Sequence, residues 1–225
     1  MIRTGQVMRI LALVIVNLAL VNPAVWSQEP PMTKIVVRLS GPKIPADSFA
    51  AKPVTFYLAG ELCGRVEEEV DQEHRVHPLF INSAPDTWIV NLANKTAQHV
   101  VDHQPPFSFH APILFVPKTK DRPEANAEFK GLNFGTEVRF FREQGARDLG
   151  QRKVDGKECN AFSVTKGSIE VTLFVDSVTN QPSQLDIIKD GKLDRSYRYL
   201  EYKTNLPFQQ SLFEPPDGVR VRDAN

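Results

Sequence analysis

The sequence predicts a mainly β protein, built on an antiparallel sheet with one or two short helices. Apolar and polar residues alternate through most of the chain after residue 30, as in KIVVRLS and IEVTLFV, and a strand places successive side chains on opposite faces. Asp-Gly pairs separate such segments at Asp155-Gly156 and at Asp190-Gly191, and this pair favours the type I′ turn of a β-hairpin. About ten strands are expected, with sequential strands as neighbours.

The chain begins with a segment that is typical of a secretory signal peptide. Arg3 and Arg9 precede an apolar run over 10–21, and the small residue Ser27 follows it. The run is too short to cross a hydrocarbon core of ~30 Å as a helix. The alternatives are a buried helix and an uncleaved anchor. Cleavage is expected after about Ser27, which leaves 28–225 as one exported domain, periplasmic or secreted, without a transmembrane anchor.

The charge balance excludes some partners. The chain has 27 basic and 27 acidic residues, and the first 27 residues hold two arginines and no acid. The exported part therefore has 25 basic against 27 acidic residues, a formal charge of −2. Because nucleic-acid binding needs a basic surface, no nucleic-acid partner is expected. A chain of this length can bury one sizeable core.

In chain order, the first half is expected to form short strands. These are 34–41, 54–60, 62–70, 77–83, a hairpin over 86–102 that turns at Asn94-Lys95, and 111–117. Gly60-Glu61 provides a further turn. The acidic run Glu67–Glu69 is expected to be a solvated strand face rather than a pair of catalytic carboxylates.

The middle of the chain is expected to contain one amphipathic helix over 132–144. Phe134, Val138 and Phe141 recur at a spacing of three to four residues, and Gly145 follows as a stop signal. The segment RFF is also compatible with a strand. A polar stretch, 118–128, precedes this helix and is expected to be a loop.

The second half contains strands joined by sharper turns. Asp176 ends one strand, and its carboxylate is expected to accept hydrogen bonds from the amides of the following turn. Asn180 tolerates a left-handed backbone, and Pro182 fixes φ at the entrance to the next strand. A catalytic aspartate would need a partner acid, base or metal, and none is evident. An architectural role is therefore expected for Asp176.

These motifs form a pattern: a glycine turn, a strand that ends in Asp, a turn with Pro, and a closing Phe-x-x-Pro. In this sequence the pattern consists of Gly156, Asp176, Pro182, Phe213 and Pro216. The region resembles the second half of LolA-like proteins, the periplasmic outer-membrane lipoprotein carriers and sorting proteins. The segment FYLAGELCGRVEEEV is similar to the strand–turn–strand of that superfamily that carries an arginine, here Arg65.

The resemblance implies a curved, unclosed antiparallel half-barrel covered by one or two helices. One departure concerns the beginning of the domain. The true carriers begin with an amphipathic helix, and no helical pattern occurs between Gln28 and Lys34. The helix over 132–144 is therefore expected to cover the concave face.

Ten apolar residues are expected to line that concave face. They are Val37, Leu39, Val54, Phe56, Leu58, Trp88, Val90, Leu92, Val171 and Leu173. An apolar cavity of this kind can take up acyl chains, at about 0.8 kcal/mol per buried methylene. The alternative is that the same residues form an ordinary core against the helix. Arg65 is expected to contact a polar head or to tether the helix.

The two cysteines, Cys63 and Cys159, allow two interpretations. In an oxidising compartment they form a possible disulfide. Bridging requires Cα atoms within about 7 Å, however, and otherwise the residues are two separate buried thiols.

All five histidines fall within one stretch, as His74, His77, His99, His103 and His110. Their spacing does not favour a metal site. His74 and His77 would lie on opposite faces of a strand. His99 and His103 would be ~13 Å apart along one. No metal and no cofactor are expected.

Three functions are compatible with these observations. The first is non-enzymatic binding of a lipid, a lipoprotein acyl chain or another apolar ligand on the concave face. The second is an envelope sensor or interaction module with a filled core, which would bind an envelope protein. The third and least favoured is a metal-dependent enzyme, which would require at least three histidines to converge.

Overall fold

The computed structural model describes residues 29–114 and 129–224, which form one twelve-stranded sheet. The expected signal peptide lies outside the described residues. The strands are β1 Met32–Ser40, β2 Pro53–Ala59, β3 Cys63–Glu68, β4 Pro78–Ser83, β5 Asp86–Asn91, β6 Thr96–Val101, β7 Arg147–Val154, β8 Lys157–Lys166, β9 Ile169–Asp176, β10 Pro182–Lys189, β11 Lys192–Leu206 and β12 Arg220–Asp223.

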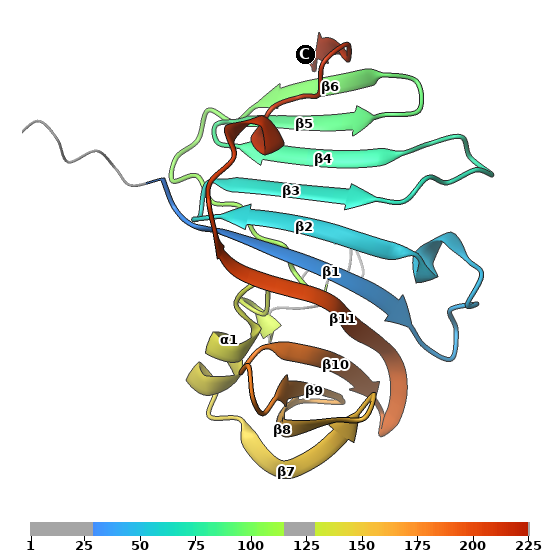
Figure 1. Ribbon diagram of the computed structural model, residues 1–225, viewed down its shortest axis with the longest axis vertical. Helices are drawn as coiled ribbons and strands as arrows, with labels where there is room; N and C mark the ends of the chain where they lie inside the picture. The colour runs from blue at the N-terminus through green and yellow to red at the C-terminus, as the bar shows by residue number, and fades with distance from the viewer. Residues whose placement is uncertain (1–28, 115–128, 225) are drawn as a thin grey trace, which may run out of the picture.

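The sheet is open, and its strand order is β12-β6-β5-β4-β3-β2-β1-β11-β10-β9-β8-β7. All neighbours pair antiparallel except β12 and β6, which are parallel. The long pairing of β1 with β11 joins two groups of hairpins. The group β7 to β10, next to β11, curls away from the group β2 to β6, next to β1 (Figure 1). The predicted fold class, a curved and unclosed antiparallel sheet with little helix, is confirmed.

The predicted turns are present. Asp155 and Gly156 have φ of 49° and 78°, and Asp190 and Gly191 have φ of 52° and 73°. These positive values are what a type I′ hairpin requires. Lys95 also has a positive φ, between β5 and β6. Local turn chemistry therefore fixes several hairpins of the sheet.

Helix α1 spans Glu137–Glu143, five residues shorter at its start than predicted. Gly135 ends the preceding irregular segment with φ of 88°, and a Cβ there would lie 2.7 Å from Leu58 Cδ1. The positive φ of Gly135 does not fit an α-helix, so α1 begins after this residue although the apolar spacing extends further back. The end was predicted well, because Gly145 follows with φ of 60°. Of the strand predicted over 111–117, the described residues form only an isolated bridge.

Asp176 has the architectural role that was predicted. Its Oδ1 accepts hydrogen bonds from the amides of Val178 and Thr179, both at 2.9 Å. These backbone bonds, first that from Thr179, lower the pKa of the Asp176 carboxyl. Asn180 has φ of 55°, and Pro182 begins β10.

Two apolar cores lie on opposite faces of the sheet. The first core packs α1 and the segments 109–114 and 129–134 against strands such as β1, β2 and β9; we call this side the helix face. The second core lies on the opposite face, where the C-terminal segment 206–219 covers β2 to β6. Alternation along β2 shows the division, because Phe56 belongs to the first core and Tyr57 packs against the second.

Candidate functional site

The centre of the helix face is filled by side chains. The Phe134 ring centroid lies 4.5 Å from that of Phe56 and 5.4 Å from that of Tyr197. Ile113 and Leu132, from the two covering segments, are 1% exposed. The helix face therefore holds separate clefts around a packed centre, rather than one wide cavity across the described sheet.

Helix α1 is fastened to the sheet by a buried carboxyl. Glu137 is fully buried, and the hydroxyls of Tyr199 and Tyr202 donate to its two oxygens at 2.8 and 3.3 Å. Burial raises the pKa of Glu137 to about 7, against the opposing effect of these hydrogen bonds. Since both tyrosines belong to β11, this contact fixes the start of α1 at the seam between the two groups of strands.

The first cleft, which we call the η1 cleft, lies beside the 3-10 turn η1 (Phe49–Ala51) and has a volume of about 370 Å³. Its lining is mostly apolar and includes four of the ten predicted residues. The lining residues are Val37, Leu39, Phe49, Ala50, Lys52, Pro53, Val54, Phe56, Val66, Glu68, Glu69, Phe134 and Tyr197. Alternation brings β1, β2 and β3 side chains to this cleft, while the turn η1 supplies one wall.

The second cleft, of about 700 Å³, lies between α1 and the strands β8 and β9. Val138 and Phe141 of the helix face Phe162, Leu173 and Val175 of the strands. Arg142, Asn160 and Asn180 add polar groups. The helix thus forms one wall, as expected for a covering element.

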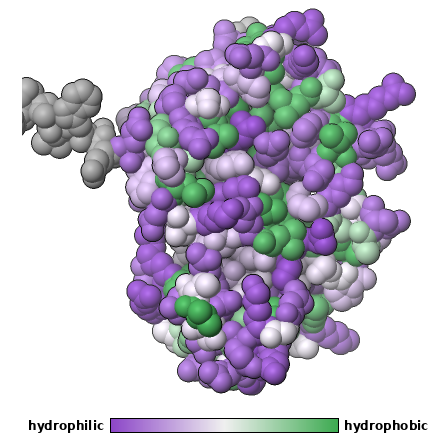
Figure 2. All heavy atoms as spheres, in the orientation of Figure 1, coloured by the Kyte–Doolittle hydropathy of each residue, from purple (hydrophilic) through white to green (hydrophobic). Residues whose placement is uncertain are grey.

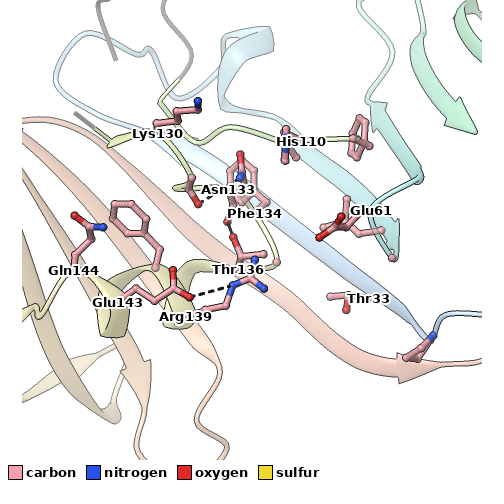
Figure 3. A pocket seen from close by; sticks show the side chains of 18 residues that line it. Thr33, Glu61, His110, Lys130, Asn133, Phe134, Thr136, Arg139, Glu143 and Gln144 are labelled. Atoms are coloured by element: carbon pink, nitrogen blue, oxygen red, sulfur yellow. Dashed lines mark hydrogen bonds and ion pairs between the residues drawn. The ribbon is translucent and has the colours of Figure 1, made fainter. Parts of the chain in front are cut away.

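A third pocket, of about 430 Å³, lies on another side of α1 (Figure 3). Phe134 and Phe140 contribute apolar surface, but charged and polar side chains surround the opening. In Figure 3 Lys130 and Arg139 lie on different sides of the pocket, and Arg139 Nε is 3.9 Å from Glu143 Oε1. This mixed lining suits a polar ligand better than an acyl chain. Of the two remaining clefts, the η1 cleft contains four of the ten predicted lining residues and the second cleft contains only Leu173, so the η1 cleft is the candidate for an apolar ligand.

The ten predicted lining residues do not share one face. Seven of them lie on the helix face, and their role in lining a ligand site stays a prediction: Val37, Leu39, Val54, Phe56, Leu58, Val171 and Leu173. Trp88, Val90 and Leu92 belong to the second core, so their predicted place is wrong. The register explains this, because Tyr57 pairs with Arg65, Arg65 with Ile81, and Ile81 with Trp88. Residues that pair directly on neighbouring strands lie on the same face of the sheet. Tyr57 points away from the helix face, and so does Trp88.

Arg65 also lies on the opposite face and is 9% exposed. Its Nη1 donates to the Leu212 carbonyl at 3.2 Å, and its Nη2 pairs with Glu67 Oε2 at 2.8 Å. Leu212 belongs to the 3-10 turn η3 (Gln210–Phe213). Arg65 therefore tethers the C-terminal segment, and the expectation that it tethers the helix or meets a ligand head on the helix face is wrong.

The two cysteines are both free. Cys63 is in β3 and Cys159 in β8, and five strands separate these two in the sheet. At the usual strand spacing this is ~29 Å along the sheet, far beyond disulfide reach. The possible disulfide is therefore wrong, and the two residues are separate thiols, of which Cys159 is buried and Cys63 is partly exposed.

Three of the five histidines, His74, His77 and His99, have acidic partners that sequence reasoning missed. His99 stacks on Trp88, and its ring nitrogens lie 2.8 Å from Asp86 Oδ1 and from Asp223 Oδ1. The hydrogen bonds to these carboxylates, first that to Asp223, raise the pKa of His99. His74 pairs with Asp71 in the same way. Within residues 29–114 and 129–224, no group of three metal-ligating side chains converges.

The η1 cleft also contains residues that the sequence analysis did not assign to a site. Phe49 and Tyr197 reach it from distant parts of the chain. Glu68, expected on a solvated face, pairs with Val54 and so shares its face. The period of two between Val66 and Glu68 was a readable signal for this. None of the helices formed by the described residues has the length and apolar character needed to cross a membrane.

No protein-family model and no curated protein matches the sequence. The structure is similar to an uncharacterized conserved protein from Thermus thermophilus, with 10% identity and a TM-score of 0.46, over 87% of this chain and 91% of that one. It is also similar to a chain of the Pseudomonas aeruginosa MucA/MucB complex, with 13% identity and a TM-score of 0.41, over 83% of this chain and 56% of that one.

A third similar structure is a putative outer membrane lipoprotein-sorting protein domain from Vibrio parahaemolyticus. Identity is 11% and the TM-score is 0.33, over 82% of this chain and 88% of that one. All three TM-scores are below 0.5 and all three identities are below 25%. At these identities and TM-scores the likenesses carry no argument about ligand or partner.

Proposed function

We propose that this protein is an exported, non-enzymatic binding protein that holds one apolar chain, such as a lipid or lipoprotein acyl chain, in the η1 cleft. The observation that supports this is the apolar lining of the cleft by Val37, Leu39, Val54 and Phe56. Its volume of about 370 Å³ falls within the usual range for small-ligand sites, ~300–1,000 Å³. Helix α1 and the covering segments shield the rest of the helix face.

The size of the cleft sets the expected affinity. About eight methylenes would gain about 6 kcal/mol on transfer from water. The loss of translational and conformational freedom on binding reduces this gain. A ligand that stays bound through purification therefore needs contacts in addition to those of its apolar chain.

Native mass spectrometry of the protein, purified gently from the envelope of its own host, tests this proposal. A co-purifying mass of several hundred daltons that organic solvent releases as lipid is the expected result. Ala50 is exposed and lines the cleft, so Ala50→Trp should fill it and remove the bound mass. Ala93→Trp, at an exposed turn outside the cleft, is the control. A folded protein that stays bare when offered phospholipid and acylated peptide would contradict the proposal.

A second candidate function is an interaction module, favoured by the packed centre of the helix face and by exposed apolar residues beyond it. Ile89 is 53% and Val100 39% exposed. They face the same side as Phe80 and Leu58 through the strand register. In the view of Figure 2, however, apolar residues form small separate patches on a mostly hydrophilic surface. A bare protein in the lipid experiment would direct the search to a protein partner.

A further inference from the structure

One charged side chain of the η1 cleft is out of keeping with its apolar lining. Glu68 lies at the end of β3, directly opposite Val54 of β2, so both side chains are on the helix face. The neighbouring cleft surface comes from Val54, Phe56 and Val66. Val66 is two residues before Glu68 on β3 and faces the same side. An apolar residue at position 68 would continue this apolar face, and the carboxylate interrupts it.

This carboxylate has no partner within the described residues. Burial raises the pKa of the Glu68 carboxyl. Lys52, the basic residue of the cleft, is engaged elsewhere: its Nζ donates to the Val70 carbonyl at 2.7 Å. A half-buried carboxylate without a partner is unfavourable for the fold alone, because nothing replaces the lost hydration.

The rest of the cleft is also suited to a cation. Its charged lining residues are Lys52, Glu68 and Glu69, which together carry a formal charge of −1. Aromatic rings form its walls, and ring faces attract ammonium groups. The structure already contains such a contact, since Lys52 Nζ lies 5.8 Å from the Phe49 ring centroid at this cleft.

We propose that the η1 cleft selects an amphiphilic cation, whose ammonium group meets Glu68 while its apolar chain packs along Val54, Phe56 and Leu39. The inference rests on the proposed function, because it specifies the end group of the ligand that the cleft holds. Charge complementarity with Glu68 and contact with the aromatic walls both favour this end group over a neutral or anionic one.

Titration calorimetry with three probes of equal chain length tests the inference: dodecylamine, dodecanol and dodecanoate, each below the concentration at which it forms micelles. Dodecylamine is expected to bind about tenfold more tightly than dodecanol, and dodecanoate more weakly than both. Glu68→Gln should reduce the affinity for dodecylamine to that for dodecanol and leave dodecanol binding unchanged. Glu68→Lys should reverse the order, so that dodecanoate binds best.

Glu73→Gln, which removes an exposed acid outside the cleft, is the charge-matched control and should leave all three affinities unchanged. Thermal melts of each variant confirm folding. Equal binding of all three probes, or a preference that survives Glu68→Gln, would overturn the inference while the proposed function stands. A folded wild-type protein that binds none of the three would overturn both.

Discussion

Replacing Glu137 with glutamine tests how α1 is held to the sheet. The Glu137 carboxyl is fully buried between the helix and β11, where the hydroxyls of Tyr199 and Tyr202 contact it. No cationic side chain of the described residues pairs with it. Its pKa is raised from 4.5 to about 7 because burial disfavours the ionised form.

The raised pKa of Glu137 determines how the stability of the protein changes with pH. The folded protein binds the proton more tightly than the unfolded chain, so ionisation of Glu137 lowers stability. The difference between 4.5 and about 7 corresponds to about 3 kcal/mol, at about 1.4 kcal/mol per unit. The free energy of unfolding should therefore rise by up to this amount as the pH falls from about 8 to 4.5. Glu137→Gln removes this dependence and should be the more stable protein at about pH 8.

Urea unfolding, followed by circular dichroism at a series of pH values, measures the effect. Glu143→Gln is the matched control, because Glu143 is an exposed residue of the same helix. The quantity of interest is the stability difference between wild type and Glu137→Gln at each pH. A difference that is constant between about pH 5 and 8 would refute the account of Glu137 as a buried, neutral carboxyl.

Three further predictions concern turns and the C-terminal strand. An NMR titration should place the pKa of His99 above its ordinary value of 6.5, and Asp223→Asn should lower it, because Asp223 is its main partner; an unchanged value would contradict the ion pair. Gly135→Ala should lower the free energy of unfolding in urea by about 2–3 kcal/mol, because φ is 88° and the new methyl group would meet Leu58. Gly145→Ala, which has open space, should lower it by only about 1 kcal/mol, and equal losses would exclude the contact with Leu58. Asp176→Ala should lower the melting temperature by about 3 °C at neutral pH and less in acid, because its pKa is lowered by the turn amides that it binds; a pH-independent loss would contradict this.

The sequence predicts what is decided locally and misses what depends on distant contacts. Asp155-Gly156 and Asp190-Gly191 specify their turns by their own backbone preferences. The face of Trp88 depends instead on the pairing register of three successive hairpins. Alternation within one strand shows which residues share a face, but not which face of the sheet it is. Glu137 looks like an ordinary polar residue of an amphipathic helix, and its burial becomes evident only once Tyr199 and Tyr202 are placed beside it. Glu68 is an intermediate case, because its spacing from Val66 indicates its face, whereas Phe49 and Tyr197 reach the same cleft from distant parts of the chain.

The pairing of β1 with β11 has a consequence for the order of folding. Val37 pairs with Tyr199 at the middle of the sheet, although about 160 residues separate them along the chain. Most of the remaining neighbours are hairpins that close over short loops. Bringing β1 and β11 together is therefore the entropically expensive step. The two groups of hairpins can each form locally, but without β11 no strand connects β1 with β10 in the sheet. Folding of the whole sheet is expected to be a late event that waits for nearly the entire chain.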